Sequence, residues 1–370
     1  MVDDDVLLQP WALEDAKDEV ALVGHEDPRE WRFFETRQEA LQGAHCTDVD
    51  LLATHGSLLG RRLADILTQG APALETACQH MIAAVQNPGD LTIRLTFAGL
   101  AGDSARYCAT RLLLSRGRIR QQLLFDVRSL ALATTTREVH WIPTRLSITH
   151  DAACVGYCMG LLNVDTLPPF LPVGRNEDGV FGLTLRTTDD RSLSAHLPFG
   201  VIHDSRRSSH YSADEVIPSA RHLRPSDALM SLTSMLRGAT PPIFDLSAGF
   251  LPTVGRTFIA WSDLDAQDLA MLVAEAGLRF RCPEIAASSD RCVTGGTSNN
   301  DLYTRKIDDY REVFLESAAR HDFWPFDHST HGSHGEFRQL LRAWGRLLMH
   351  WTHIRDCALA YVAPSTVMRF

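Results

Sequence analysis

The segment from Leu91 to Phe97 alternates apolar and polar residues without a break. Side chains of a β-strand point to opposite faces in turn, so this period predicts a half-buried strand. The glycine-bounded stretch that follows, from Gly99 to Ser104, predicts a turn capped by Asp103 or Ser104. A helix is expected next, over 105–114. A strand, a tight turn and a helix in succession favour layered α/β structure.

Other patterns extend this prediction. Leucines at helical spacing predict a helix that begins at Thr47 or Asp48, and a last helix is expected over 336–361. The residues 183–185 and 196–202 are expected to be extended. The pair Pro241-Pro242 suggests a boundary. The predicted fold is therefore an α/β region over 1–240, with a mixed central sheet and a helical insert at about 45–150, followed by a mainly helical region over 241–370.

Composition excludes several classes of partner. The chain of 370 residues carries 36 lysines and arginines against 46 aspartates and glutamates, a net charge of −10. Nucleic acids and anionic membranes reward clustered cations, so neither is expected as the main partner. The sequence holds no run of about 18 apolar residues and has an acidic start, so neither a membrane span nor a secretory signal is expected. The eight cysteines are then expected as free thiols in the cytoplasm.

An acidic pair in a glycine frame is the first candidate site. Glu177 and Asp178 follow Arg175 and Asn176 and precede Gly179. A glycine lets a sugar ring or another backbone approach closely, because it has no Cβ. Either carboxylate could act as a general base toward an acceptor hydroxyl. The alternative is structural, since acidic residues also favour the first turn of a helix.

A second acidic run stands near the start of the sequence, at Asp3, Asp4 and Asp5. Mn²⁺ and Mg²⁺ prefer oxygen ligands and often bridge carboxylates to substrate phosphates. His203, beside Asp204, could complete such a site, and His196 is a weaker candidate. A solvated acidic terminus and a structural histidine are the alternatives. Cys158 has no histidine at a diagnostic spacing, so a thiol nucleophile is not expected.

Taken in order, these motifs resemble those of one enzyme family. The segment 2–6, Val-Asp-Asp-Asp-Val, looks like the metal motif of GT-A-type glycosyltransferases, which use nucleotide-diphospho-sugars. The segment 175–182, Arg-Asn-Glu-Asp-Gly-Val-Phe-Gly, looks like the later acidic motif that supplies the catalytic base. His203 stands where that family often places a metal-ligating histidine. The resemblance covers roughly residues 1–205.

The resemblance implies a function and a set of roles. It implies a metal-dependent glycosyltransferase that moves a sugar from a nucleotide-sugar donor to an acceptor. Asp3, Asp5 and His203 would hold Mn²⁺ or Mg²⁺, and Asp178 or Glu177 would be the base. The residues that would contact substrate are Arg175, Asn176 and Gly179. The family's N-terminal nucleotide-binding half is not expected in this sequence, which leaves two alternatives: a metal-dependent phosphoester hydrolase, or a non-catalytic partner protein on a transferase-like scaffold.

Overall fold

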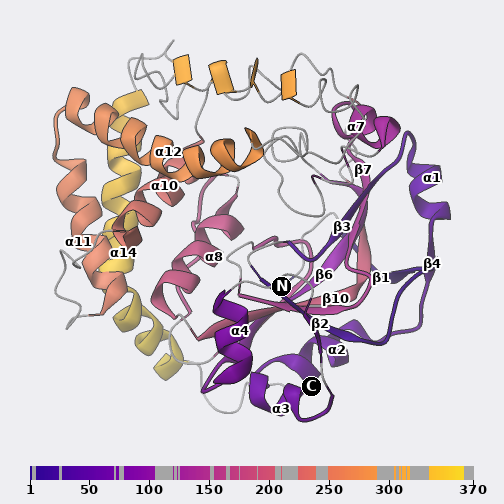
Figure 1. The fold of residues 1–370 in the computed structure, drawn as a ribbon. Helices are drawn as coiled ribbons and strands as arrows, with labels where there is room; N and C mark the ends of the chain where they lie inside the picture. Colours follow the sequence, from indigo (N-terminus) through magenta and orange to yellow (C-terminus); the bar gives the residue numbers. More distant parts are fainter. Residues whose placement is uncertain are drawn as a thin grey trace. The chain divides into compact units, whose positions relative to one another are not determined.

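A computed structural model of the chain describes most of its helices and strands (Figure 1). The described residues are 1, 6–24, 27–70, 72–74, 79–104, 120, 123, 126–150, 154–163, 167–174, 176–189, 191–204, 210, 224–238, 249–289, 304–305, 308–309, 311–313, 315–316 and 333–361. The predicted helix over 105–114 lies outside them. No helix in these ranges combines the length and the apolar character that crossing a membrane requires.

The chain divides into two compact units, and each is assembled from separate segments. Unit 1 comprises residues 1–162, 189–221 and 281–319. Unit 2 comprises residues 163–188, 222–280 and 320–370. Unit 2 therefore takes residues from both sides of the predicted boundary near residue 240.

Unit 1 is built on a sheet of ten described strands that mixes parallel and antiparallel pairs. This confirms the α/β prediction in its general form. The strand order is β3-β7-β6-β10-β8-β2-β5, with β1, β4 and β9 paired off this path. The strands are β1 (Val6–Leu13), β2 (Val20–Val23), β3 (Glu30–Phe33), β4 (Ala44–Cys46), β5 (Ala73–Leu74), β6 (Thr92–Asp103), β7 (Glu138–Ile142), β8 (Leu146–Thr149), β9 (Met159–Leu161) and β10 (Ser192–His203).

Two long parallel strands, β6 and β10, form the centre of this sheet (Figure 1). On its outer side, each of these two strands pairs with one strand along its first half and with another along its second half. The first half of β6 pairs with β9 and its second half with β7. Likewise, the first half of β10 pairs with β8 and its second half with β1. Most other strands therefore take their place from this one pair.

Glycines and a proline shape the central pair. Gly99 lies opposite Gly200, and a Cβ on Gly99 would stand 2.6 Å from the carbonyl oxygen of Trp141. Gly102 has φ +102°, a backbone conformation that side-chain-bearing residues rarely adopt. Pro198 falls where the ladder between β6 and β10 is interrupted, which is where a strand tolerates a residue without an N–H. The glycine-rich stretch after Phe97 thus continues strand β6, and its glycines let neighbouring strands approach closely. The predicted turn at Gly99 to Ser104 is therefore wrong.

Short helices pack on this sheet, and three of them begin at a side chain that accepts a backbone N–H. Thr36, Asp50 and Asp126 cap α1, α2 and α7 in this way. The helix predicted from Thr47 or Asp48 therefore begins later, at Leu51. Leu58, Leu63 and Ile66 pack with sheet residues such as Ile93 and Leu193 in one apolar cluster. The helices of this unit are α1 (Arg37–Gln42), α2 (Leu51–Leu58), α3 (Leu63–Leu67), α4 (Gln79–Gln86) and α7 (Val127–Ala133).

The regular secondary structure described in unit 2 is all helix. The pattern-based prediction of a last helix is confirmed by α14, and Leu183 to Leu185, expected to be extended, are helical in α8. The helical period is hard to recognise in this sequence because all of Asp178 to Arg186 is buried, so no polar face alternates with an apolar one. The helices are α8 (Glu177–Thr188), α10 (Pro225–Gly238), α11 (Phe250–Ser262), α12 (Ala266–Ser289), whose last residues belong to unit 1, and α14 (Ser333–Tyr361).

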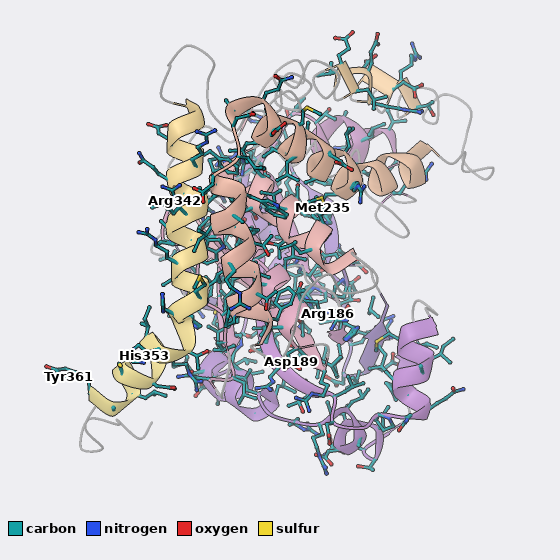
Figure 2. All side chains as sticks on the ribbon, turned by 90° about the vertical axis from the view of Figure 1, so that its left-hand side faces the viewer. Arg186, Asp189, Met235, Arg342, His353 and Tyr361 are labelled. Carbon is teal, nitrogen blue, oxygen red and sulfur yellow. The ribbon has the colours of Figure 1, made fainter. Side chains whose placement is uncertain are left out.

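The backbones of α11 and α14 touch at two glycines, and Figure 2 shows these helices side by side. A Cβ on Gly255 would lie 2.4 Å from the carbonyl oxygen of Gly345, and a Cβ on Gly345 would lie 2.6 Å from that of Gly255. Both distances are far inside van der Waals contact, and the obstacle is backbone. Glycine at both positions therefore lets the backbones of the two helices approach this closely.

We expect Gly345→Ala to destabilise unit 2 by about 1–3 kcal/mol, because the added methyl group forces the two helices apart. The matched control is Gly335→Ala in the same helix, where nothing lies within 4 Å of the new Cβ. Alanine is the better helix former, so the control should be neutral or stabilising by up to ~1 kcal/mol. Chemical denaturation followed by circular dichroism measures both. Equal effects of the two substitutions would contradict the close contact.

Candidate functional site

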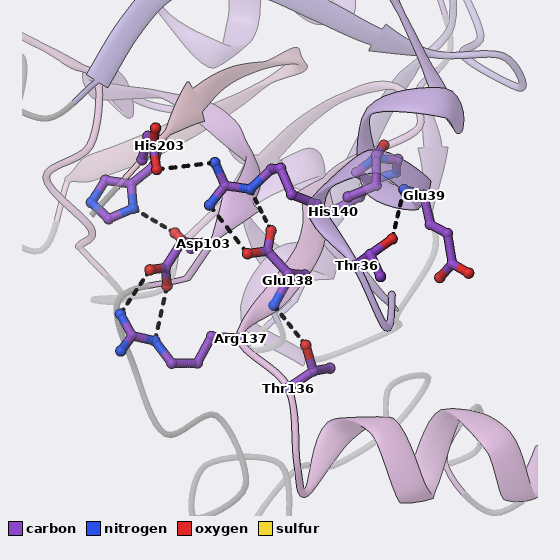
Figure 3. A network of polar contacts seen from close by, with 11 residues as sticks. Thr36, Glu39, Asp103, Thr136, Arg137, Glu138, His140 and His203 are labelled. Atoms are coloured by element: carbon purple, nitrogen blue, oxygen red, sulfur yellow. Dashed lines mark hydrogen bonds and ion pairs between the residues drawn. The ribbon is translucent and has the colours of Figure 1, made fainter. Parts of the chain in front are cut away.

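The carboxyl ends of β6 and β10 bring charged residues together in unit 1. Because the two strands are parallel, their last residues, Asp103 and His203, end at the same edge of the sheet, and His203 pairs with Gly102. Ligands of open α/β sheets bind outside the carboxyl ends of parallel strands. We call the residues gathered there the edge network: Asp103, His203, Asp204, Arg37, Arg137 and Glu138 (Figure 3).

A buried bidentate ion pair is the deepest part of the edge network. Arg137, just before β7, donates from Nε and Nη2 to the two carboxylate oxygens of Asp103, both at 2.9 Å. The side chains are 9% and 1% exposed. Charges this deep need a partner of opposite sign, since desolvation costs several kcal/mol for each ion. The pair therefore fixes the start of β7 against the end of β6.

A second arginine joins two more carboxylates across the edge. Arg37 of α1 donates from Nε to Glu138 at 2.5 Å and from Nη2 to its other oxygen at 3.1 Å. Its Nη1 lies 3.3 Å from Asp204, which is 59% exposed. Burial works against the charge on Arg37, but Glu138 and then Asp204 outweigh it and raise the pKa of the guanidinium. The network thus runs from a fully buried carboxylate to one in solvent.

His203 is held in one orientation by the strand beside it. Its Nδ1 lies 2.5 Å from the backbone carbonyl oxygen of Asp103, which can only accept, so Nδ1 carries the proton. The ring of Tyr157 packs against it at 5.2 Å between centroids, and the Tyr157 hydroxyl donates to the Ser104 carbonyl at 2.6 Å. In this tautomer the imidazole lone pair is on Nε2. Metal-ligating histidines are commonly oriented by such a carbonyl.

His196, the weaker candidate, belongs to a different buried group. Arg29 donates twice to Asp27, at 2.8 and 2.9 Å, and lies 3.4 Å above the centroid of the Trp141 ring. Burial opposes the charge of Asp27, yet Arg29 holds the pKa of that carboxyl below its usual value. Burial and then Arg29 lower the pKa of His196 to about 3. His196 is thus a neutral core residue at physiological pH.

Cys158 does have a histidine close by, which the sequence did not reveal. His55 Nε2 lies 3.6 Å from the Cys158 sulfur, while His55 Nδ1 lies 2.6 Å from the Thr96 hydroxyl. Burial raises the pKa of the Cys158 thiol and lowers that of His55 to about 4. Both groups are therefore neutral at physiological pH, and the pair is a packed core contact.

The acidic pair predicted as catalytic lies in unit 2, at the first turn of α8. Asp178 is 7% exposed, and its carboxylate accepts the Gly179 N–H at 2.8 Å. Asn176 has φ 71° and donates from Nδ2 to Asp227 of α10 at 3.0 Å. A Cβ on Gly179 would lie 2.5 Å from the Asn176 side-chain oxygen. Helix start and close packing, the structural alternative, thus describe the local role of this motif.

The predicted site residues that the structure describes are therefore divided between the two units. His203 is in the edge network, while Glu177, Asp178, Asn176 and Gly179 are in unit 2. Asp3, Asp5 and Arg175 lie outside the described residues. Within the described ranges, no three histidine, cysteine, aspartate or glutamate side chains gather as metal ligands. His203 is the only member of the predicted metal set that these ranges include.

Three members of the edge network, Arg37, Arg137 and Glu138, were not predicted from the sequence. Arg137 and Glu138 stand directly before the apolar run of β7, and charged residues at a strand start are a signal, although an unspecific one. Asp103 drew attention only as part of the turn predicted before the helix over 105–114. Its partner lies 34 residues away, and no local pattern joins the two.

Comparisons with protein-family models, with curated proteins and with solved structures found no match. The geometry of the described residues and the motifs of the sequence therefore carry the functional argument.

We expect Asp103→Asn and Arg137→Met each to destabilise unit 1 by about 3–5 kcal/mol, because each leaves a buried charge without its compensating ion. The double variant should cost less than the sum of the two by at least ~1 kcal/mol. Asp65→Asn is the control: it breaks an exposed pair with Arg62, which solvent screens, so little change in stability is expected. Urea denaturation measures all four variants. Strict additivity of the single effects would contradict the buried pair.

Proposed function

We propose that the chain is a metal-dependent glycosyltransferase of GT-A-like architecture that transfers a sugar from a nucleotide-sugar donor to an acceptor. The carrying observation is the place of His203. The order of the motifs assigns this histidine to the metal, and it ends a central parallel strand at the carboxyl edge of an α/β sheet, where ligands of such sheets bind. Its Nδ1–H is directed to a backbone carbonyl, as in many metal-binding histidines.

The metal would be Mn²⁺ or Mg²⁺, held by Asp3, Asp5 and His203. When bound, such an ion neutralises the charge that develops on a departing diphosphate. Arg37 is the partly exposed cation of the edge network, with a side chain 28% exposed. We propose that it assists in holding the donor phosphates while Glu138 keeps its guanidinium oriented.

The acceptor hydroxyl would lose its proton to a carboxylate of the segment 177–178. Asp178, in the first turn of α8, is our first choice for this base. Glu177 is the second choice. Arg175, Asn176 and Gly179 would contact the substrate, the arginine through its charge.

The donor half of this proposal is tested by thermal shift with UDP- and GDP-sugars, each with and without Mn²⁺. We expect nucleotide and metal together to raise the melting temperature by several degrees, and His203→Gln to lose that shift. Asp65→Asn serves as an exposed-carboxylate control and should keep it. Stabilisation by metal alone would favour the phosphoester hydrolase. No shift with any donor or metal would favour the non-catalytic partner.

The base is tested on a donor that gives a shift, by following release of the nucleoside diphosphate. We expect Asp178→Asn to slow release by about 100-fold or more. Asparagine keeps the side-chain oxygen that accepts the Gly179 N–H, so the melting temperature should change by no more than a few degrees. Glu177→Gln is the matched control one residue away. Full activity of Asp178→Asn would exclude Asp178 as the base. Loss of activity in Glu177→Gln alone would identify Glu177 as the base instead.

A further inference from the structure

A cavity of about 330 Å³ opens in unit 2 beside the paired helices α11 and α14. It lies where the end of α11 meets the start of α14. All of its lining residues are polar, charged or glycine: Ser262, Asp263, Gly335, Arg338, Gln339 and Arg342. Arg342 is labelled on α14 in Figure 2. A cavity with this lining suits a polar ligand, since an apolar one would find no apolar surface to bury.

The two arginines are held in place by the end of α11. Arg342 donates from Nε to the Ser262 hydroxyl at 3.2 Å and from Nη2 to Asp263. Arg338 donates from Nη2 to the Leu264 carbonyl. Anchored guanidiniums lose little further side-chain entropy when a ligand binds, which favours binding.

Arg338 retains unused donor capacity. A guanidinium has five N–H donors, and the Leu264 carbonyl takes one of them. Its Nε–H is buried and has no hydrogen-bond partner. Because this Nε atom has no exposed surface, a ligand in the cavity would bind to the Nη donors of the same guanidinium.

The net charge of the lining residues indicates the charge of the ligand that the cavity would bind. Arg338 and Arg342 carry two positive charges against the single negative charge of Asp263, which leaves the lining net positive. Gly335 lies in the first turn of α14, whose backbone N–H groups have no acceptor within the helix. These donors add to the same positive potential.

We propose that this cavity is an anion site that binds a phosphate group, either free phosphate or the phosphate of a small phosphorylated molecule. A tetrahedral dianion presents enough acceptor oxygens for the remaining Nη donors of Arg338, the Gln339 amide and the helix start together. The site lies within unit 2 and is separate from the proposed transferase chemistry.

Isothermal titration of the full chain with inorganic phosphate, at low ionic strength, tests the proposal. We expect saturable binding, weakened at least about tenfold in Arg338→Gln. Gln339→Glu should also weaken it, because this exposed side chain would then carry a like charge into the cavity. Asp263→Asn should strengthen it by removing a repelling carboxylate. Arg346→Gln is the control, since Arg346 is exposed on the same helix and does not line the cavity.

Several outcomes decide the matter. Tighter binding of glucose 1-phosphate than of phosphate supports a phosphorylated metabolite, and equal binding supports the free anion.

Stronger phosphate binding by Asp263→Asn also separates a binding site from a purely structural role of the arginines as caps of α11, which predicts no gain in affinity. No saturation up to about 50 mM phosphate, or unchanged affinity in both Arg338→Gln and Gln339→Glu, overturns the proposal. Arg338→Gln should keep the nucleotide-sugar shift with Mn²⁺, so the two proposals fail separately.

Discussion

The parallel pairing of β6 with β10 is the constraint on which the sheet unit depends. Both strands are twelve residues long, and nearly every side chain of β6 from Leu95 onward is buried. Outer strands attach to the pair half by half, so a shift in its register would displace β1, β7, β8 and β9 together. A Cβ on Gly102 would collide with the His203 carbonyl oxygen of β10, and a Cβ on Gly99 or Gly200 would collide with Ile142 of β7, so these glycines make room for the neighbouring strands.

Burying charge at the end of this pair has a structural consequence and a functional one. The ion pair of Asp103 and Arg137 has a desolvation cost that only precise bidentate geometry offsets. That precision fixes the edge of the sheet, and the carbonyl of Asp103 then orients His203. A candidate ligand histidine is therefore positioned by the backbone of the neighbouring strand, while the more exposed Arg37 and Asp204 face solvent at the same edge.

Sequence patterns predicted what is local and missed what is distant. The alternation over Leu91 to Phe97 found the start of β6, but the glycines after it were interpreted as a turn, since the strands they pack against are far away in sequence. The helical period found α14 because its exposed and buried faces differ. The same period failed at Leu183 to Leu185, where every face of α8 is buried.

The candidate site shows the same division. His203 could be singled out because it stands beside an aspartate in a recognisable order of motifs. Arg37 and Arg137 could not, since each joins the edge network only through a carboxylate that folding brings to it, for Arg37 from 101 residues away. The cavity beside Arg338 is also a product of folding, because its lining comes from the end of one helix and the start of another.

Hydrogen exchange of backbone amides, followed by mass spectrometry on the intact chain, tests the central strand pair most directly. If β6 and β10 organise the sheet, their amides should exchange among the slowest of unit 1, and Gly102→Ala should accelerate exchange at Asp103 and His203 first. Fast exchange along both strands in the unaltered protein, with slower exchange in the outer strands, would contradict the account.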